Sequence, residues 1–334
     1  MLIELILIFL LSLVFIKIIQ KYAIFLSLID VPNARSAHTN ETARGAGIGF
    51  YLAVLLVLTF FHFDFILTYI WTFIAIFLVF AIGVFDDYKG TSPKAKFFVL
   101  IVATILLWFD DIVINNLGVF FGFEISLGWF AIPFTIFAVV GFANALNLID
   151  GLDGLSTTVS IVILSAFFFV GYNNNDLFLI AVSASFIASL LAFLIYNWYP
   201  ASIFMGDSGS LTIGFIISIL AIKSLAYLPA ISIFFLAAIP LFDTIIVMIR
   251  RKINGRSMFA ADSCHMHHVI KELFNDNVKK TVLFLAVLQV VYSLVGLQLD
   301  KDIDEGFLLI LFIFNIVMLY LFLNEMIKKQ KRKC

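Results

Sequence analysis

Acidic and amide residues recur at three-residue steps in one segment, Asn144-Ala-Leu-Asn147-Leu-Ile-Asp150-Gly151-Leu-Asp153-Gly154. This spacing places the four polar side chains on one face if the helix continues, and the glycines allow the chain to open into a turn. Such a row of oxygen atoms suits a hard cation or the hydrogen-bond donors of a nucleotide. The segment is therefore the strongest candidate for a functional site.

Carboxylates also stand beside two other apolar runs. Asp86 and Asp87 follow the run at 66–85, and adjacent acids near low dielectric raise at least one pKa unless a cation is present. Mg²⁺, a lysine partner such as Lys89, and a base poised for proton removal remain alternatives for this pair. Asp207 precedes the run at 211–222 within Gly-Asp-Ser-Gly-Ser, where it is either a helix N-cap or a cation ligand beside a phosphate-binding turn.

Basic residues and histidines fill two further loops. The first loop contains Arg35, His38 and Arg44, the last of which is followed by glycines that allow an oxyanion to approach the backbone. A larger loop contains Arg251 and Arg256 and then His265, His267 and His268. Zinc is one interpretation of three histidines, but a carboxylate-rich site favours hydrogen bonds to sugar or phosphate oxygens. Asp243, after Pro240, is expected to face the bundle interior.

The elements that position these residues are apolar. Of 334 residues, 63% are hydrophobic and 13% are charged, against roughly 25% charged in soluble domains. Eleven runs predict an all-α polytopic transmembrane bundle with one domain over residues 1–334, although ten spans remain an alternative. The runs at 97–109 and 211–222 are short and need flanking residues. The eleven runs are 2–19, 47–63, 66–85, 97–109, 129–146, 155–170, 177–195, 211–222, 225–249, 282–299 and 307–323.

Charge predicts the orientation of this bundle. With eleven spans, all but two of the 21 Lys and Arg residues fall on one side, and the exceptions are Lys223 and Lys301. Positive loops stay in the cytoplasm, so the N-terminus is expected outside and the C-terminus inside. Every polar segment described above then lies at the cytoplasmic boundary, where an ionisable group can meet a soluble substrate.

Five of these motifs, in this order, resemble the polyprenyl-phosphate N-acetylhexosamine-1-phosphate transferases over nearly the whole chain: Asp30 to Gly47, Asp86-Asp87, Asn144 to Gly154, Gly206 to Ser210, and Ser257 to His268. The resemblance implies that Asp207 and Asn147 ligate Mg²⁺, with Mn²⁺ as an alternative. It implies that Asp86 is a base or positions the lipid phosphate. The resemblance also implies supporting and substrate-binding roles for Asp87, Asp150, Asn144, Asp153, Arg35, His38, Arg251, Arg256, His265, His267 and His268.

The expected activity is transfer of N-acetylglucosamine 1-phosphate from a UDP-sugar to undecaprenyl phosphate, releasing UMP, at the cytoplasmic face of a bacterial inner membrane. The pattern of His265, His267 and His268 favours the N-acetylglucosamine branch over the muramoyl-pentapeptide branch. The product would start a cell-surface glycan such as O antigen or a cell-wall polymer. Partners are expected to be the two substrates, the bilayer and a second copy in a homodimer, with no nucleic acid.

Other activities remain open from the sequence. The same reaction could use a FucNAc, QuiNAc or GalNAc type of donor. A CDP-alcohol transferase would need further spaced acids downstream of Asp153, and they are missing. An ion-coupled transporter would show mid-membrane polar residues on broken helices and often an internal repeat, and the sequence pattern indicates neither.

Overall fold

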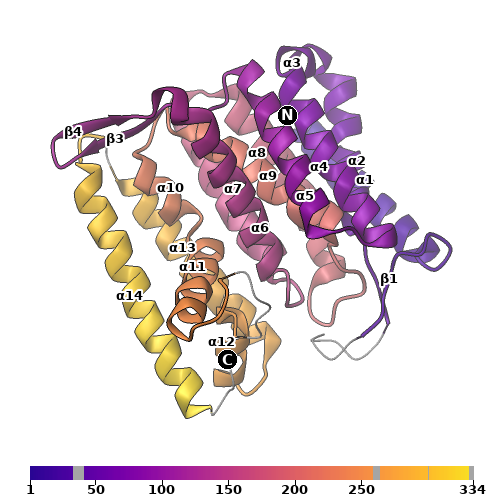
Figure 1. The fold of residues 1–334 in the computed structure, drawn as a ribbon. Coiled ribbons are helices and arrows are strands. Elements are labelled where there is room, and N and C mark those ends of the chain that lie inside the picture. Colours follow the sequence, from indigo (N-terminus) through magenta and orange to yellow (C-terminus); the bar gives the residue numbers. More distant parts are fainter. Residues whose placement is uncertain (33–40, 259–263, 300, 331–334) are drawn as a thin grey trace.

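The computed structural model describes residues 1–334 except 33–40, 259–263, 300 and 331–334 (Figure 1). Arg35 and His38, predicted to bind substrate, lie outside the described residues. Helices account for most of the described chain. They are α1 Leu2–Tyr22, α2 Ala46–Phe61, α3 Phe63–Thr68, α4 Ile70–Lys89, α5 Pro93–Leu107, α6 Ala131–Ile149, α7 Leu155–Asn174, α8 Leu177–Asn197, α9 Asp207–Ser224, α10 Ala230–Leu236, α11 Ala238–Ile253, α12 Met266–Leu273, α13 Val278–Gln298 and α14 Glu305–Lys329.

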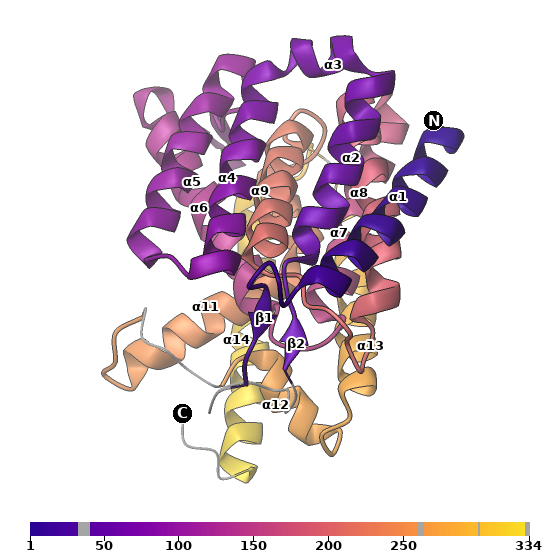
Figure 2. The same cartoon turned by 90° about the vertical axis from the view of Figure 1, so that its right-hand side faces the viewer.

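Each of the eleven apolar runs is mainly helical, and the run at 66–85 is interrupted at Tyr69, between α3 and α4. The two short runs extend toward their N-termini, since α5 begins at Pro93 and α9 begins at Asp207. With this extension α9 is long enough to cross a membrane, whereas α5 has only 15 residues. Among the described residues, eight helices are long and apolar enough to cross a membrane, or nine if α10 and α11 count as one bent span. The chain is therefore a multi-pass membrane protein, and the shorter apolar helix α2 lies in the same bundle (Figure 2).

The run at 225–249 differs from the expected single helix. It forms α10 and α11, which meet at an angle of 92°. Pro240 explains the break, since proline has no N–H and its ring clashes with the carbonyl four residues earlier, at Leu236. As a result α11, which carries Asp243, turns away from the direction of α10 and packs against α6 (Figure 2).

Helix α9 is the centre of the bundle, with 83% of its membrane-length window buried. Glycines let α2 and α4 approach its first turn. A Cβ on Gly83 of α4 would lie 2.6 Å from the backbone oxygen of Asp207, and a Cβ on Gly47 of α2 would overlap the backbone of Gly209. These close crossings place the end of α4 beside the start of α9. We call the end of the bundle where α4 and α6 stop and α9 begins the site end.

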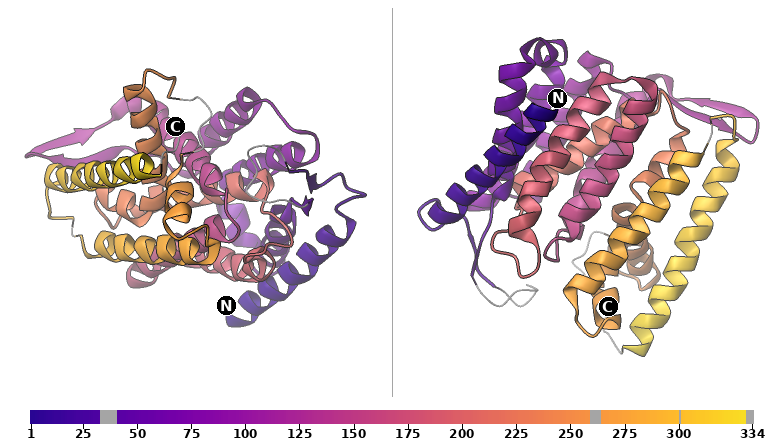
Figure 3. Two further views of the ribbon diagram at one scale, coloured as in Figure 1. Left: turned by 90° about the horizontal axis from the view of Figure 1, so that it is seen from below. Right: turned by 180° about the vertical axis from the view of Figure 1, so that it is seen from behind.

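Two short hairpins complete the fold. Strands β1 (Ile29–Asp30) and β2 (Thr42–Ala43) are antiparallel at the site end. Strands β3 (Asn116–Phe120) and β4 (Phe123–Ser126) project from the opposite end, where Asp304 accepts hydrogen bonds from the turn between them. Helices α13 and α14 form the flank of the bundle farthest from α1 (Figure 3).

Candidate active site

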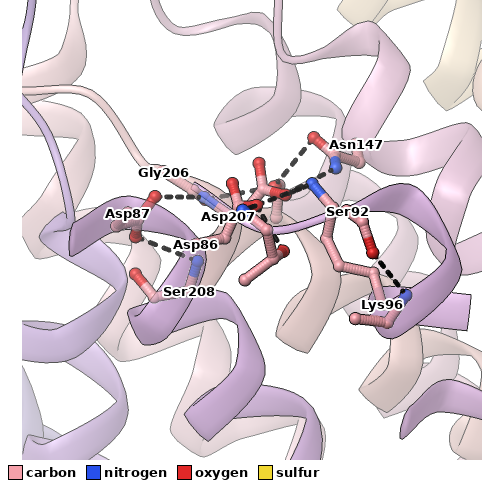
Figure 4. A network of polar contacts seen from close by, with 11 residues as sticks. Asp86, Asp87, Ser92, Lys96, Asn147, Gly206, Asp207 and Ser208 are labelled. Carbon is pink, nitrogen blue, oxygen red and sulfur yellow. Dashed lines mark hydrogen bonds and ion pairs between the residues drawn. The ribbon is translucent and has the colours of Figure 1, made fainter. Parts of the chain in front are cut away.

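Asp86, on the last turn of α4, and Asp207, the first residue of α9, share one lysine. The Nζ of Lys96, on the first turn of α5, lies 3.1 Å from an oxygen of Asp86 and 2.7 Å from an oxygen of Asp207 (Figure 4). Asp86 also accepts hydrogen bonds from the backbone N–H and the hydroxyl of Thr91. The α4–α5 turn therefore fixes both the carboxylate of Asp86 and its cation.

The carboxylate of Asp87, unlike that of Asp86, contacts the backbone at the start of α9. Its two oxygens accept hydrogen bonds from the backbone N–H groups of Asp207, at 2.8 Å, and Ser208, at 3.1 Å (Figure 4). Asp87 is only 2% exposed, and it satisfies amides that every helix N-terminus leaves without an intrahelical partner. A carboxylate is also favoured by the partial positive charge at this end of α9. Asp87 thus caps α9 and fixes the position of Asp207.

Gly206, the residue before α9, makes this cap sterically feasible. It has φ +73°, and a Cβ added there would lie 2.5 Å from an oxygen of Asp87. Because only glycine avoids both the strain and the overlap, the sequence Gly206-Asp207 is required by the cap. Asp86, Asp87 and Asp207 each offer an oxygen, and these three oxygens lie within 4.8 Å of one another.

Helix α6 contributes a neutral oxygen and nitrogen to the same place. The Nδ2 of Asn147 lies 3.4 Å from Asp207, and its Oδ1 accepts a hydrogen bond of 3.2 Å from the hydroxyl of Ser210. Asp150 follows at the end of α6. Burial, together with repulsion from Asp207, Asp87 and Asp153, raises the pKa of the Asp150 carboxyl well above its ordinary value. The local field is therefore strongly negative.

These groups line one cavity of about 290 Å³ that is open to solvent. Its walls come from α4, α6, α9 and the loops at the site end. Arg44 also lines it, and the Nε atom of Arg44 is buried without a hydrogen-bond partner among the described residues. The described residues that line the cavity are Asp30, Arg44, Asp86, Asp87, Asn147, Asp150, Gly151, Leu152, Asp153, Asn197, Phe204, Met205, Gly206, Asp207 and His268.

One wall is held by Asp153 and Asn197. Asp153 accepts a hydrogen bond of 2.9 Å from the backbone N–H of Ala201, in the loop before α9. The Oδ1 of Asn197, at the end of α8, accepts from the N–H of Gly154 and the hydroxyl of Thr157. Asn197 is 3% exposed, so these hydrogen bonds fix the start of α7 against the loop that leads to Asp207.

The histidine segment reaches the cavity from α12. Asp243 of α11, which is 1% exposed, accepts a hydrogen bond of 2.7 Å from the Nδ1 of His265 and another from the backbone N–H of Met266. His267 packs on Gly151, where a Cβ would lie 2.8 Å from its Nε2. His268 lines the cavity itself. Asp243 therefore anchors the N-terminus of α12 beside the Asn144 to Gly154 segment.

Comparison with known proteins identifies the family of the chain. The model of glycosyl transferase family 4 matches residues 69–225. The probable undecaprenyl-phosphate N-acetylglucosaminyl 1-phosphate transferase of Bacillus subtilis (strain 168) is 31% identical over 308 residues, which cover 90% of this chain and 85% of that protein. The chain belongs to glycosyl transferase family 4.

Two other relatives show how far the similarity extends for this family 4 glycosyl transferase. The undecaprenyl-phosphate alpha-N-acetylglucosaminyl 1-phosphate transferase of Yersinia pestis is 32% identical over 284 residues, covering 80% of this chain and 76% of that protein. A phospho-N-acetylmuramoyl-pentapeptide-transferase of Listeria monocytogenes is 38% identical over 154 residues, covering 42% of this chain and 48% of that protein.

The donor set of the family 4 site fits a divalent cation. Three carboxylate oxygens within 4.8 Å of one another, with the Asn147 amide adjacent, are hard oxygen ligands of the kind that Mg²⁺ prefers. Asp86 and Asp207 point toward the shared centre, whereas Asp87 reaches it while both of its oxygens already accept backbone hydrogen bonds. The histidines lie outside this group of three acids, among the described residues, so oxygen atoms define the candidate metal centre.

The structure brings together most of the residues predicted from the sequence, but not all. Asp86, Asp87, Asn147, Asp150, Asp153, Asp207 and His268 share the cavity. Asn144 lies one turn back on α6 and is half-buried outside the cavity lining. Arg251 is buried and donates to the carbonyl of Met258, while Arg256 is exposed. His265 and His267 stand behind the lining.

Two polar residues of this site, Lys96 and Asn197, were not expected from the sequence. Lys96 was counted as a topology cation, and Lys89 was considered as the partner of the acid pair, yet the helix that starts at Pro93 places Lys96 between Asp86 and Asp207. A lysine three residues after a proline at a helix start would have been the available signal. Asn197 gives no such signal, because it stands alone after an apolar helix.

Proposed function

We propose that the protein transfers N-acetylglucosamine 1-phosphate from UDP-N-acetylglucosamine to undecaprenyl phosphate, giving undecaprenyl-diphosphate-N-acetylglucosamine and UMP. The observation that carries this proposal is the group of Asp86, Asp87 and Asp207, which opens into a polar cavity at the end of a membrane bundle. A lipid phosphate and a soluble nucleotide can meet only at such a boundary. Relatives named for this reaction match most of the chain, which supports the choice of sugar.

The chemistry is phosphoryl transfer. An oxygen of the lipid phosphate attacks the β-phosphorus of the UDP-sugar in line, the bond from that phosphorus to the bridging oxygen breaks, and UMP leaves with that oxygen. Because the attacking phosphate is already anionic near neutral pH, direct displacement needs no proton removal, and Asp86 then acts to position the lipid phosphate. An aspartyl-phosphate intermediate is the alternative, which ping-pong exchange kinetics would reveal.

Several groups of the cavity would stabilise the negative charge of the phosphates during the transfer. Mg²⁺, or Mn²⁺ in its place, would be held by Asp207 and Asn147 with Asp86 adjacent, and it supplies neutralisation of the diphosphate when bound. Lys96 forms an ion pair with both Asp86 and Asp207 and so holds the two carboxylates close together. Arg44, with its buried Nε facing no protein acceptor among the described residues, is suited to a phosphate oxygen. His268 lines the cavity and is suited to donate a hydrogen bond to the sugar or diphosphate.

We place the cavity on the cytoplasmic face of a bacterial cytoplasmic membrane, with the N-terminus outside. The support is the distribution of charge, since the site end carries the basic loops and the opposite end carries Lys223 and Lys301 as its cations. UDP-sugars are then available to the cavity directly. The product would begin assembly of a surface glycan.

The test uses purified protein in nanodiscs with undecaprenyl phosphate and Mg²⁺. UDP-N-acetylglucosamine, UDP-N-acetylgalactosamine and a UDP-FucNAc or UDP-QuiNAc type of donor are offered separately, and the lipid is analysed by mass spectrometry. We expect undecaprenyl-diphosphate-N-acetylglucosamine and one UMP per lipid product. A lipid carrying a different sugar would correct the donor, and the absence of any lipid product would refute the reaction.

Matched variants connect this activity to the cavity. Asp207→Ala and Asp86→Ala are each expected to abolish UMP release. Asp64→Ala, which removes an exposed carboxylate at the opposite end of the bundle, is expected to leave it unchanged. Near-native turnover in either of the first two variants would remove that residue from the proposed site.

A further inference from the structure

A buried glutamine lies beside the break between α10 and α11. Gln289 is on α13 and is 0% exposed. It is eleven residues from the start of that 21-residue helix, which places it roughly 16 Å along the axis, near the middle of the span. An amide at this depth is costly unless both its oxygen and its nitrogen are hydrogen-bonded.

Both ends of the amide are satisfied by backbone groups that the break releases. The Nε2 of Gln289 donates to the carbonyl of Leu236 at 2.8 Å, and its Oε1 accepts from the N–H of Ile239 at 2.9 Å. Leu236 is the residue whose carbonyl Pro240 cannot use, because it lies four residues before the proline. Gln289 therefore replaces the helical hydrogen bonds that are lost where α10 ends and α11 begins.

Hydrogen bonds from α13 and α14 hold both ends of α10 in place. The hydroxyl of Ser293, one turn further along α13, accepts from Gln289 at 3.0 Å. At the other end of α10, the buried carboxylate of Glu305 on α14 accepts from the N–H groups of Ala230 and Ile231. Side chains from α13 and α14 thus hold both ends of α10, and the direction of α11 follows from the geometry at its bend.

The direction of α11 matters because this helix carries Asp243. Asp243 binds His265 and the N-terminus of α12, and α12 presents His267 to Gly151 and His268 to the cavity. The three-carboxylate group lies elsewhere, on α4 and α9. A rotation of α11 would therefore move the histidine wall of the cavity while leaving the metal-binding wall in place.

We propose that Gln289 is a positioning residue, which holds the α10–α11 bend and thereby keeps the Asp243–α12 wall against the carboxylate wall of the cavity. Its link to turnover rests on the proposed function, whereas its effect on the direction of α11 does not.

The experiment compares Gln289→Met, which keeps the length of the side chain but removes both hydrogen-bonding groups, with Gln289→Glu, whose neutral carboxyl keeps one donor and one acceptor. Gln298→Met, at the exposed end of the same helix, is the control. Cysteine-independent spin labels at Lys89 on α4 and Lys252 on α11 report the direction of α11 in nanodiscs by pulsed electron resonance. Both positions are exposed.

Gln289→Met is expected to broaden or shift the Lys89–Lys252 distance distribution. It should also lower kcat/KM for the UDP-sugar between about ten- and a hundredfold, because misplacement by about 1 Å has effects of this size. The Kd of Mn²⁺ should stay within about twofold of wild type, because the three carboxylates lie on α4 and α9 and not on α11. A twofold change in Kd corresponds to only ~0.4 kcal/mol of binding free energy. Gln289→Glu should restore both the distance and the turnover.

An unchanged distance distribution in Gln289→Met overturns the inference, as does a changed distribution with native kcat/KM. If Gln289→Met does not fold, Gln289→Asn takes its place with the same criteria, because its amide is one methylene too short to reach both backbone groups. If wild-type protein forms no lipid product, the proposed function fails, and the spin-label distances still decide whether Gln289 holds the bend.

Discussion

Asp86 and Asp87 are adjacent in sequence, yet the structure gives them separable roles, and substitution of each by alanine tests that difference. Asp87→Ala leaves the backbone N–H groups of Asp207 and Ser208 without an acceptor in a buried place. Each unsatisfied N–H costs about 1–3 kcal/mol, so the loss is about 2–6 kcal/mol. Asp87→Ala also removes a buried carboxylate that lies near Asp207, and this relief offsets part of the loss. The expected loss of folding stability is therefore about 2–4 kcal/mol, in the lower part of the range.

At roughly 2 °C per kcal/mol, this destabilisation lowers the apparent Tm by about 4–8 °C. Asp86→Ala should lower it by less than about 2 °C, because Thr91, which donates to Asp86, is partly exposed and water can replace the carboxylate. The assay is differential scanning fluorimetry of each variant in the same detergent without added metal, with Asp64→Ala as the control. Equal Tm values for Asp86→Ala and Asp87→Ala would refute the division of roles.

Three further predictions concern the same cavity. Lys96→Met should lower the Kd of Mn²⁺ at least twofold, because Lys96 neutralises Asp86 and Asp207 in the protein without metal. The same variant should abolish UMP release. Weaker Mn²⁺ binding would contradict this prediction. Since the pKa of Asp150 is raised, its carboxyl holds a proton at pH values above its usual ~4, so cation binding should release that proton and weaken as the pH falls. Calorimetry in buffers of different ionisation enthalpy measures the release, and Asp150→Asn should reduce it. Asn197→Leu should lower Tm and UMP release together, since it frees Gly154 and the loop before Asp207; a normal Tm would argue against this wall contact.

Composition was sufficient to predict most of the helices, because an apolar run in lipid has few alternatives to helix. It did not predict the break between α10 and α11 or the short helix α12. The short run at 97–109 gains flanking residues at its start, but α5 has only 15 residues and is not among the candidate spans of the described chain. The Asn144 to Gly154 segment and the histidine segment do lie together, since His267 packs on Gly151. The family inferred from motif order was confirmed by relatives that match most of the chain.

What the sequence could not predict depends on contacts between helices distant in the chain. The partner of Asp86 is Lys96 instead of Lys89, because α5 folds back against α4 and α9. Gln289, some fifty residues later in the chain, hydrogen-bonds backbone groups on both sides of the bend before Pro240. Neither contact has a local pattern, since each depends on the register between packed helices.

We propose above that the carboxylates of α4 and α9, with the Asn147 amide, hold one divalent cation in the cavity. Titration of purified protein with Mn²⁺, followed by electron paramagnetic resonance of the free ion, tests this claim directly. Wild type should bind one Mn²⁺ that excess Mg²⁺ displaces, and Asp207→Asn should lose that site at the same protein concentration. Unchanged Mn²⁺ stoichiometry and affinity in Asp207→Asn would contradict the account.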